Sequence, residues 1–336
     1  MSNDEAVWTA PLAKWAGQAV ESLGPARLSV LIFHRVLERP DPIFPGEVDA
    51  HRFSQLMNLV KRSFNVLTVG DAAAQLKAGR LPPRALAITF DDGYADNAEV
   101  ALPILQRHGL KASFFVATGF LNGGRMWNDT VIETLRATKV NTLDLSSFGL
   151  ASVNIDSADQ KRQAIESLLS KIKYLSLQER EDWLQRLSVI AGSPTLPNDL
   201  MMRSDQVQHL HRAGMEIGGH TVNHPILRVL PDKQARSEIQ QGKQTLESLI
   251  GAPVDVFAYP NGKPDKDYDQ RHRDMVRELG FKVAVTTAPG VATAQSPDFE
   301  WPRFTPWDHS PTRWLGRLWA QRLRQQAHAT ALTAAL

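Results

Sequence analysis

Two acidic side chains stand together where an apolar run ends. Asp91 and Asp92 follow the stretch Ala85–Phe90 and are themselves followed by Gly93. Carboxylates held this close repel each other, so a cation must stabilise at least one of them, and a divalent metal ion would do so. Taken alone, the pair equally fits a solvated Asp-Gly turn.

A second cluster of candidate ligands contains two histidines, His220 and His224, which follow Gly218 and Gly219 and precede Pro225. Neutral imidazoles four residues apart reach one cation if the chain turns between them, and with a carboxylate they form a donor set that suits zinc. The chain has ten histidines, so two unrelated surface residues are the alternative. It has no cysteine, which excludes thiolate ligands and disulfides.

Together the two clusters predict a metal-assisted hydrolase. Asp92, His220 and His224 would hold the ion, while Asp91 would stay free to take a proton from a water molecule. Zinc is the expected metal, and Co²⁺, Ni²⁺ or Fe²⁺ accept the same ligands.

These two motifs, in this order, resemble the polysaccharide deacetylase (NodB-homology) family of carbohydrate esterases, and specifically its permuted poly-N-acetylglucosamine deacetylases. The resemblance covers about residues 28–304, apart from an insertion. It implies a deformed (β/α)₇ barrel and the removal of acetyl groups from an N-acetylated glycan. It also implies that Asp91 is the general base and that Asp92, His220 and His224 bind the metal.

The segment Phe257–Gly262 resembles a third family motif, Arg-x-Pro-Tyr-Gly, which follows a strand. The resemblance implies that the backbone N–H of Asn261 binds the oxyanion, a task that suits a fixed backbone donor. The motif arginine is Ala258 in this chain. Arg303 is the candidate to orient Asp91 in its place, and the alternative is an ordinary surface ion pair.

The general acid of the family is a histidine after an apolar strand late in the chain, a pattern that this chain shows early, as Leu28–Phe33 followed by His34. By resemblance to the permuted enzymes, His34 would protonate the leaving amine. A histidine that merely ends a strand is the alternative, and His309 is a weaker substitute. The substrate-binding residues expected from all the motifs are Ile32, Trp127, Tyr259, Pro260 and Asn261. Among these, Ile32 would line the acetyl pocket, and Trp127 would stack on a sugar or anchor the insertion.

The elements that must position these residues alternate along the chain. Short apolar runs typical of buried strands are separated by amphipathic helical patterns, which predicts an α/β fold with a parallel sheet closed into a TIM-like barrel. The expected strands are Leu28–Phe33, Asn65–Val69, Ala85–Phe90, Ala112–Val116, Met215–Gly218, Asp255–Ala258 and Lys282–Thr286. The rhythm is interrupted at about 121–202, which we interpret as a mostly helical insertion with helices near Gln160–Leu175 and Gln178–Ile190.

We therefore expect an N-terminal helical segment at 1–24, the barrel at 25–310, and a basic amphipathic helix at 311–336. The apolar face of the last helix would contain Trp314, Leu315, Leu318, Trp319 and Leu323, with Arg313, Arg317, Arg322 and Arg324 beside them. We favour a helix packed on the barrel with a solvated basic face. The alternative is a helix lying at a membrane interface, for which this composition is also typical.

The bulk composition limits the function classes. Lys and Arg number 38 against 36 Asp and Glu, a net charge of +2 that gives no general attraction to nucleic acid. Phosphate-binding glycine motifs and the Gly-x-Ser-x-Gly elbow are absent. No secretory signal pattern opens the chain. We expect a cytoplasmic protein, with the last helix as a candidate peripheral contact to the inner face of the membrane. The alternative functions are an O-deacetylase, a hydrolase of small cyclic amides, and a non-catalytic glycan-binding protein.

Overall fold

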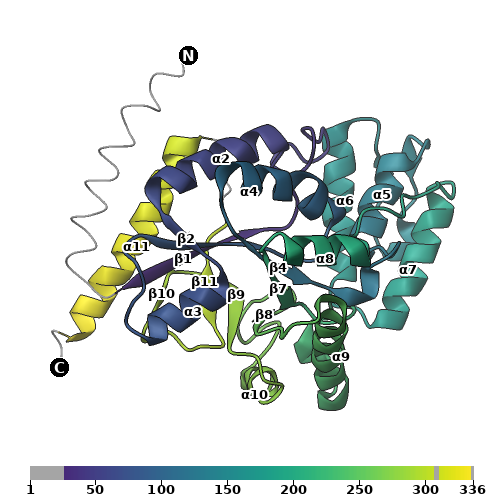
Figure 1. Cartoon of the computed structure of the whole chain (residues 1–336). Coiled ribbons are helices and arrows are strands. Elements are labelled where there is room, and N and C mark those ends of the chain that lie inside the picture. The colour runs from purple at the N-terminus through teal and green to yellow at the C-terminus, as the bar shows by residue number, and fades with distance from the viewer. Residues whose placement is uncertain (1–25, 306–309, 334–336) are drawn as a thin grey trace.

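Parallel strands form a barrel in this computed structural model, which describes residues 26–305 and 310–333 (Figure 1). The barrel strands, each paired with the next, are β1 (Arg27–Phe33), β3 (Ala85–Phe90), β4 (Ser113–Val116), β7 (Glu216–Gly219), β8 (Val256–Ala258), β9 (Val283–Pro289) and β11 (Trp301–Arg303). The ring closes because the Ile32 N–H donates to the Phe304 carbonyl at 3.1 Å, and the Phe304 N–H donates to Val30 at 2.7 Å. The predicted (β/α)₇ barrel is confirmed.

Two further strands lie outside this ring. β2 (Asn65–Leu67) pairs with the first half of β3, and β10 (Ala292–Thr293) runs antiparallel to the start of β1. Helices cover the outside of the barrel: α2 (Ala50–Ser63), α4 (Leu102–His108), α8 (Ser204–Arg212), α9 (Asp232–Ile250), α10 (Gln270–Glu278) and α11 (Pro311–Thr333). In contrast, the buried side chains of α3 (Val69–Lys77) pack with those inside the barrel. Side chains alternate along β1: Leu28 and Val30 pack inside the barrel, whereas Leu31 and Phe33 pack beneath the helices.

The insertion forms a helical body at one side of the barrel (Figure 1). It contains α5 (Trp127–Ala137), the short pair β5 (Thr142–Leu143) and β6 (Val153–Asn154), α6 (Ala158–Ile172) and α7 (Leu177–Ile190). Its buried side chains form an apolar cluster separate from those of the barrel. Because α6 and α7 lie close to the two helical stretches expected from the sequence, that part of the prediction holds, whereas α5 and the strand pair were not foreseen.

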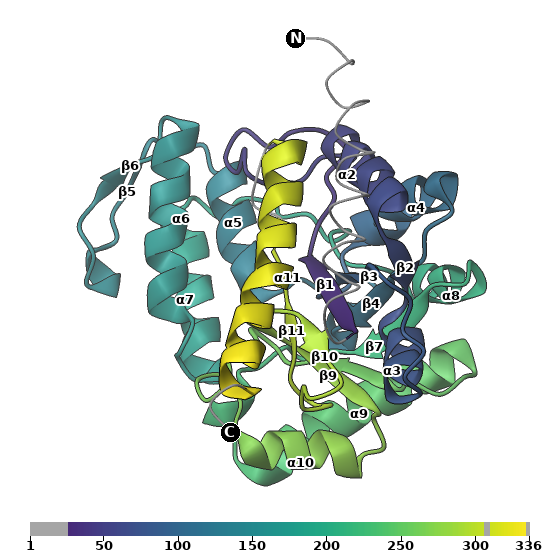
Figure 2. The same cartoon turned by 90° about the vertical axis from the view of Figure 1, so that its left-hand side faces the viewer.

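The C-terminal helix α11 runs along the barrel beside α2 and β1 (Figure 2). Trp314 and Leu318 are fully buried, and the Trp319 ring stacks on Phe64 with centroids 5.4 Å apart. This is the packed arrangement favoured above, with two corrections. Arg322 is not solvated but 1% exposed, and Leu323, placed on the apolar face, is 42% exposed.

The buried guanidinium of Arg322 donates hydrogen bonds to several polar groups at the start of the barrel strands. Its guanidinium donates to the Ser29 hydroxyl at 2.9 Å and to the carbonyls of Ala85 and Arg27 at 3.1 Å each. The predicted N-terminal segment 1–24 and His309 lie outside the described residues. Within the described ranges, no helix combines the length and hydrophobicity needed to cross a membrane.

Candidate active site

The two aspartates extend from the C-terminal end of β3 into the mouth of the barrel, and they have different partners. Arg303, at the end of β11, holds Asp91 with two hydrogen bonds of 2.7 Å each. The guanidinium is itself fixed, since it donates to the Thr286 carbonyl at 2.7 Å and to the Thr89 hydroxyl at 3.2 Å. The structure thus brings together the arginine and the carboxylate that the sequence analysis had paired.

This contact determines the charge of the carboxylate. Burial alone would raise the pKa of Asp91, but the Arg303 guanidinium and the nearby His220 lower the pKa by more. The pKa of Asp91 is therefore lower than its ordinary value, so the carboxylate stays ionised and can accept a proton near neutral pH.

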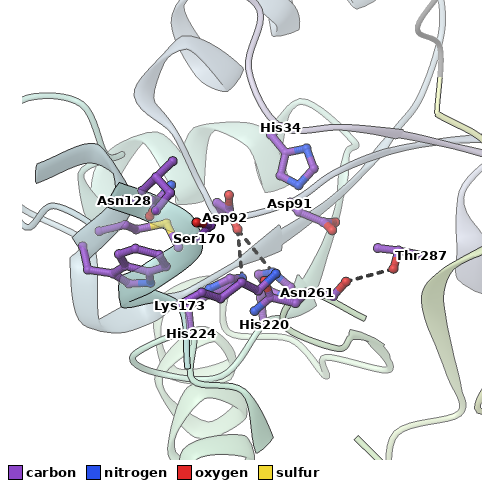
Figure 3. Close-up of a pocket in the computed structure, with 13 residues that line it drawn as sticks. His34, Asp91, Asp92, Asn128, Ser170, Lys173, His220, His224, Asn261 and Thr287 are labelled. Carbon is purple, nitrogen blue, oxygen red and sulfur yellow. Dashed lines mark hydrogen bonds and ion pairs between the residues drawn. The ribbon is translucent and has the colours of Figure 1, made fainter. Parts of the chain in front are cut away.

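Asp92 turns instead toward the two histidines (Figure 3). Its Oδ1 atom lies 3.3 Å from His220 Nε2 and 3.4 Å from His224 Nε2, and the three candidate ligand atoms lie within 4.8 Å of one another. Tetrahedral zinc with bonds of about 2.1 Å would separate neighbouring ligand atoms by about 3.4 Å. In addition, Asp92 Oδ1 is buried and has no hydrogen-bond partner among the described residues. These residues therefore fit a divalent cation.

The two histidines differ before an ion binds. His220 Nδ1 lies 2.7 Å from the Ala258 carbonyl, so this nitrogen donates a hydrogen bond and Nε2 is the atom that faces a metal. Burial would lower the pKa of His220, but the Asp92 and Asp91 carboxylates raise that pKa by more, so an ion would have to displace a proton from this ring. Burial lowers the pKa of His224 to about 4, against the opposing charge of Asp92. His224 therefore needs no deprotonation before it binds an ion.

Strained backbone is concentrated at this site. Asp92, Thr221, His224 and Asn261 have φ angles of 77°, 66°, 50° and 60°. Such left-handed conformations are uncommon for residues with side chains, and Thr221 is β-branched and so especially disfavoured. The surrounding hydrogen bonds must therefore hold these turns in place.

Helix α9 provides that support for the turn between the histidines. The Glu238 carboxylate accepts hydrogen bonds from the backbone N–H groups of Val222 and Asn223, at 2.9 and 2.8 Å, and from the Asn223 side chain at 2.8 Å. At Gly242 a Cβ atom would lie 2.8 Å from the Thr221 carbonyl oxygen. Glycine at this position lets α9 approach the turn closely.

His34 follows β1 and lines the same cavity from above the aspartates in the view of Figure 3. Its carbonyl accepts a hydrogen bond of 2.9 Å from Asn97, and Asp96 accepts from the Val36 N–H at 3.1 Å. The turn after Asp92 thus fixes the backbone around His34. Ile32 is buried on the inner face of β1, and it is not among the described residues that line the cavity.

The loop after β8 contributes Asn261. Its carbonyl accepts from the Thr287 hydroxyl at 2.8 Å, and its backbone N–H has no acceptor in the described part of the chain, which leaves it free to bind a ligand. The Tyr259 ring instead stacks on Tyr268 at 3.8 Å within the outer core, and neither Tyr259 nor Pro260 lines the cavity. Tyr259 and Pro260 can therefore affect substrate binding only indirectly, by fixing the position of Asn261.

The insertion supplies the opposite wall of the cavity, which has a volume of about 350 Å³. Trp127, predicted as a substrate contact, lies in this wall, and Arg180 covers its ring at 4.7 Å. The sequence analysis missed four polar residues of the cavity: Asn128, Ser170, Lys173 and Thr287. No motif marks them, because three belong to the insertion and reach the site only through its packing.

In sequence, the chain resembles proteins described as polysaccharide deacetylases. The family model described as polysaccharide deacetylase matches residues 78–284. YxkH of Bacillus subtilis (strain 168), provisionally described as a polysaccharide deacetylase, is 21% identical over 271 residues, which are 80% of this chain and 67% of that protein.

Solved structures show the same fold. The Streptococcus pyogenes deacetylase PplD, in complex with acetate, aligns with a TM-score of 0.59 and 20% identity over 87% of this chain and 98% of its own. IcaB from Ammonifex degensii aligns with a TM-score of 0.54 and 20% identity over 89% of this chain and 98% of its own.

Proposed function

The chain belongs to the polysaccharide deacetylase family, and we propose that it removes N-acetyl groups from the amino sugars of a polysaccharide or of a lipid-linked saccharide precursor. One observation carries the proposal. Asp92, His220 and His224 converge with metal-like spacing, while the neighbouring Asp91 is ionised and held by Arg303. A metal-assisted hydrolase that attacks an acetamide with water uses this combination of a cation and a separate base.

Asp92, His220 and His224 would hold a divalent ion, zinc by preference or else Co²⁺, Ni²⁺ or Fe²⁺, and such an ion supplies Lewis-acid polarisation. Asp91 takes a proton from the attacking water, whose oxygen bonds to the acetyl carbon. The free N–H of Asn261 stabilises the negative charge that develops on the carbonyl oxygen. His34 donates a proton to the sugar nitrogen as the C–N bond breaks. The products are acetate and a free amine.

Trp127 would stack on a sugar ring, since its other face is already covered by Arg180. Peripheral membrane contact through α11 would have to use residues other than Trp314, Leu315 and Leu318, because the barrel buries these side chains.

The test is acetate release from a panel of N-acetylated glycans by the purified protein, with and without a chelator and with zinc added back. We expect release that the chelator abolishes and zinc restores, together with one new primary amine per acetate. New hydroxyl groups without amines would instead identify an O-deacetylase. Glycan binding without acetate release would identify a non-catalytic protein.

A further inference from the structure

A lysine from the insertion lies in the wall of the cavity. Lys173 follows the end of α6 and lines the same cavity as Trp127, Ser170, the metal-binding histidines and Asn261 (Figure 3). Within the described residues, the ammonium group of Lys173 interacts only with the ring of the adjacent Tyr174, whose centre lies 5.9 Å away. No described carboxylate pairs with this ammonium group, so its charge is available to a ligand.

A second cation lies behind the same wall. Arg180 is 7% exposed, stacks on Trp127, and donates hydrogen bonds to the carbonyls of Lys173 at 3.2 Å and Leu175 at 3.5 Å. It too has no carboxylate partner in the described part of the chain. Because arginine cannot lose its proton in a protein, it adds a fixed positive charge close to the cavity.

The acidic residues of the cavity do not balance these charges. Arg303 neutralises Asp91, and Asp92 cancels only half the charge of a divalent ion. Asp129 follows the cavity residue Asn128 and accepts a hydrogen bond from Tyr94, and burial raises its pKa to about 7, so that carboxyl is only partly ionised at neutral pH. With a divalent ion held by Asp92 and the histidines, the cavity would therefore be electropositive.

The positive charge continues outward along the rim. Lys266, in the loop after β8, places its ammonium group 5.3 Å from the centre of the Tyr174 ring, and that ring is 48% exposed. Lys173 and Lys266 thus both place an ammonium group near one exposed aromatic ring, where the insertion meets the barrel loop that carries Asn261.

We propose that Lys173 and its neighbours bind an anionic group of the substrate, so that this protein prefers N-acetylated saccharides with a phosphate or carboxylate close to the reacting sugar. This inference rests on the proposed deacetylase function. The cavity is near the lower end of the range for small-molecule sites, so the anion must lie within about one sugar unit of the acetamide.

The experiment compares three substrates that share one reacting N-acetylglucosamine unit: a neutral oligosaccharide, the same chain with a phosphate ester, and the same chain with a neighbouring uronate. Acetate release gives kcat/KM for the wild type, for Lys173→Gln, and for the matched control Lys171→Gln on the exposed side of α6. We expect the wild type to prefer at least one anionic substrate. Lys173→Gln should lower kcat/KM for it about tenfold, and by less than twofold for the neutral one, while the control changes neither. The two anionic arms separate phosphate from carboxylate.

Binding to the inactive Asp91→Asn protein gives an independent measurement, by calorimetry with the preferred anionic substrate. Lys173→Gln in that background should weaken binding by a similar factor, and the difference should shrink at high salt. Equal losses on neutral and anionic substrates, or a wild type that prefers the neutral chain, would overturn the inference and leave the deacetylase proposal intact. Acetate release from none of the glycans would overturn both.

Discussion

Arg303 reaches the base from the last strand of the barrel, whereas the family motif would place an arginine at the position of Ala258, after β8. An arginine thus still contacts the base, but it comes from β11 and not from the loop after β8. A guanidinium that grips both oxygens of Asp91 removes the rotational freedom of the carboxylate and leaves its charge in place. Removal of the base and removal of its support should therefore have different effects.

Asp91→Asn removes the proton acceptor and keeps the shape of the side chain. We expect turnover to fall by a factor of about 10²–10⁴, the usual contribution of a positioned base. The zinc content, measured by elemental analysis, should stay near that of the wild type, whereas His220→Ala should lose both metal and activity. An Asp91→Asn protein with wild-type turnover would contradict the assignment of the base.

Arg303→Met should move the pH profile. Arg303 lowers the pKa of Asp91, so its loss raises that pKa, and the acidic limb of kcat/KM should shift to higher pH because Asp91 must be ionised to act. Arg303→Lys keeps the positive charge but can make only one hydrogen bond to Asp91. Its acidic limb should therefore lie between those of the wild type and Arg303→Met. A limb that stays in place in Arg303→Met would show that the contact is only structural.

The candidate metal ligands and the candidate base could be identified from the sequence, whereas most of the other residues that line the cavity could not. Asp91, Asp92, His220 and His224 stand in short motifs whose donor types limit what they can do. Lys173 and Thr287 belong to no motif, and they reach the cavity only because α6 and β9 end there. Tyr259 shows the reverse error: it belongs to a motif that reaches the site, but its own side chain packs in the core.

At the scale of elements, α9 acts as the support for the turn between the histidines. Glu238→Ala removes three hydrogen bonds from a turn that contains two left-handed residues, Thr221 and His224. Losses of supporting contacts of this kind weaken metal affinity by about 10–100-fold. We expect a weakening in that range in a competition titration with a zinc chelator. Gln240→Ala, on an exposed position of the same helix, should leave the affinity unchanged.

The strands were predictable to the extent that they are continuous and apolar. β3 begins and ends where the sequence indicated, because every residue from Ala85 to Phe90 is buried. β11 was missed because it is only three residues long and contains Pro302, which cannot donate to a neighbouring strand. Its existence is fixed by the need to close the ring between β9 and β1, which no local pattern reveals.

At the scale of the whole molecule, one partly buried acid outside the active site connects stability to pH. Glu216, at the start of β7, accepts hydrogen bonds from the Gly70 N–H at 3.0 Å and from the Ser113 hydroxyl at 2.6 Å. Burial nevertheless raises its pKa from 4.5 to about 7.

The raised pKa predicts that stability falls as the pH rises. Between pH 4.5 and 7 the unfolded chain releases this proton while the folded chain retains it, so the free energy of unfolding should drop by up to about 3 kcal/mol. Glu216→Gln cannot ionise. From pH 5 to pH 8 its melting temperature should therefore fall by less than that of the wild type, whereas the exposed control Glu166→Gln should follow the wild type. Parallel curves for Glu216→Gln and the wild type would refute the link.

The closure of the barrel through Phe304 and the anchoring of Arg322 on β1 and β3 bear on how the protein is made. The residue that closes the ring on β1, Phe304, and the helix α11 that packs beside β1 both come late in the chain. During synthesis on the ribosome, the partner that grips Asp91 emerges after every proposed metal ligand. All the proposed metal ligands are therefore synthesised before the arginine that positions the base, and Asp91 can be held by Arg303 only once the last strand of the ring has been made.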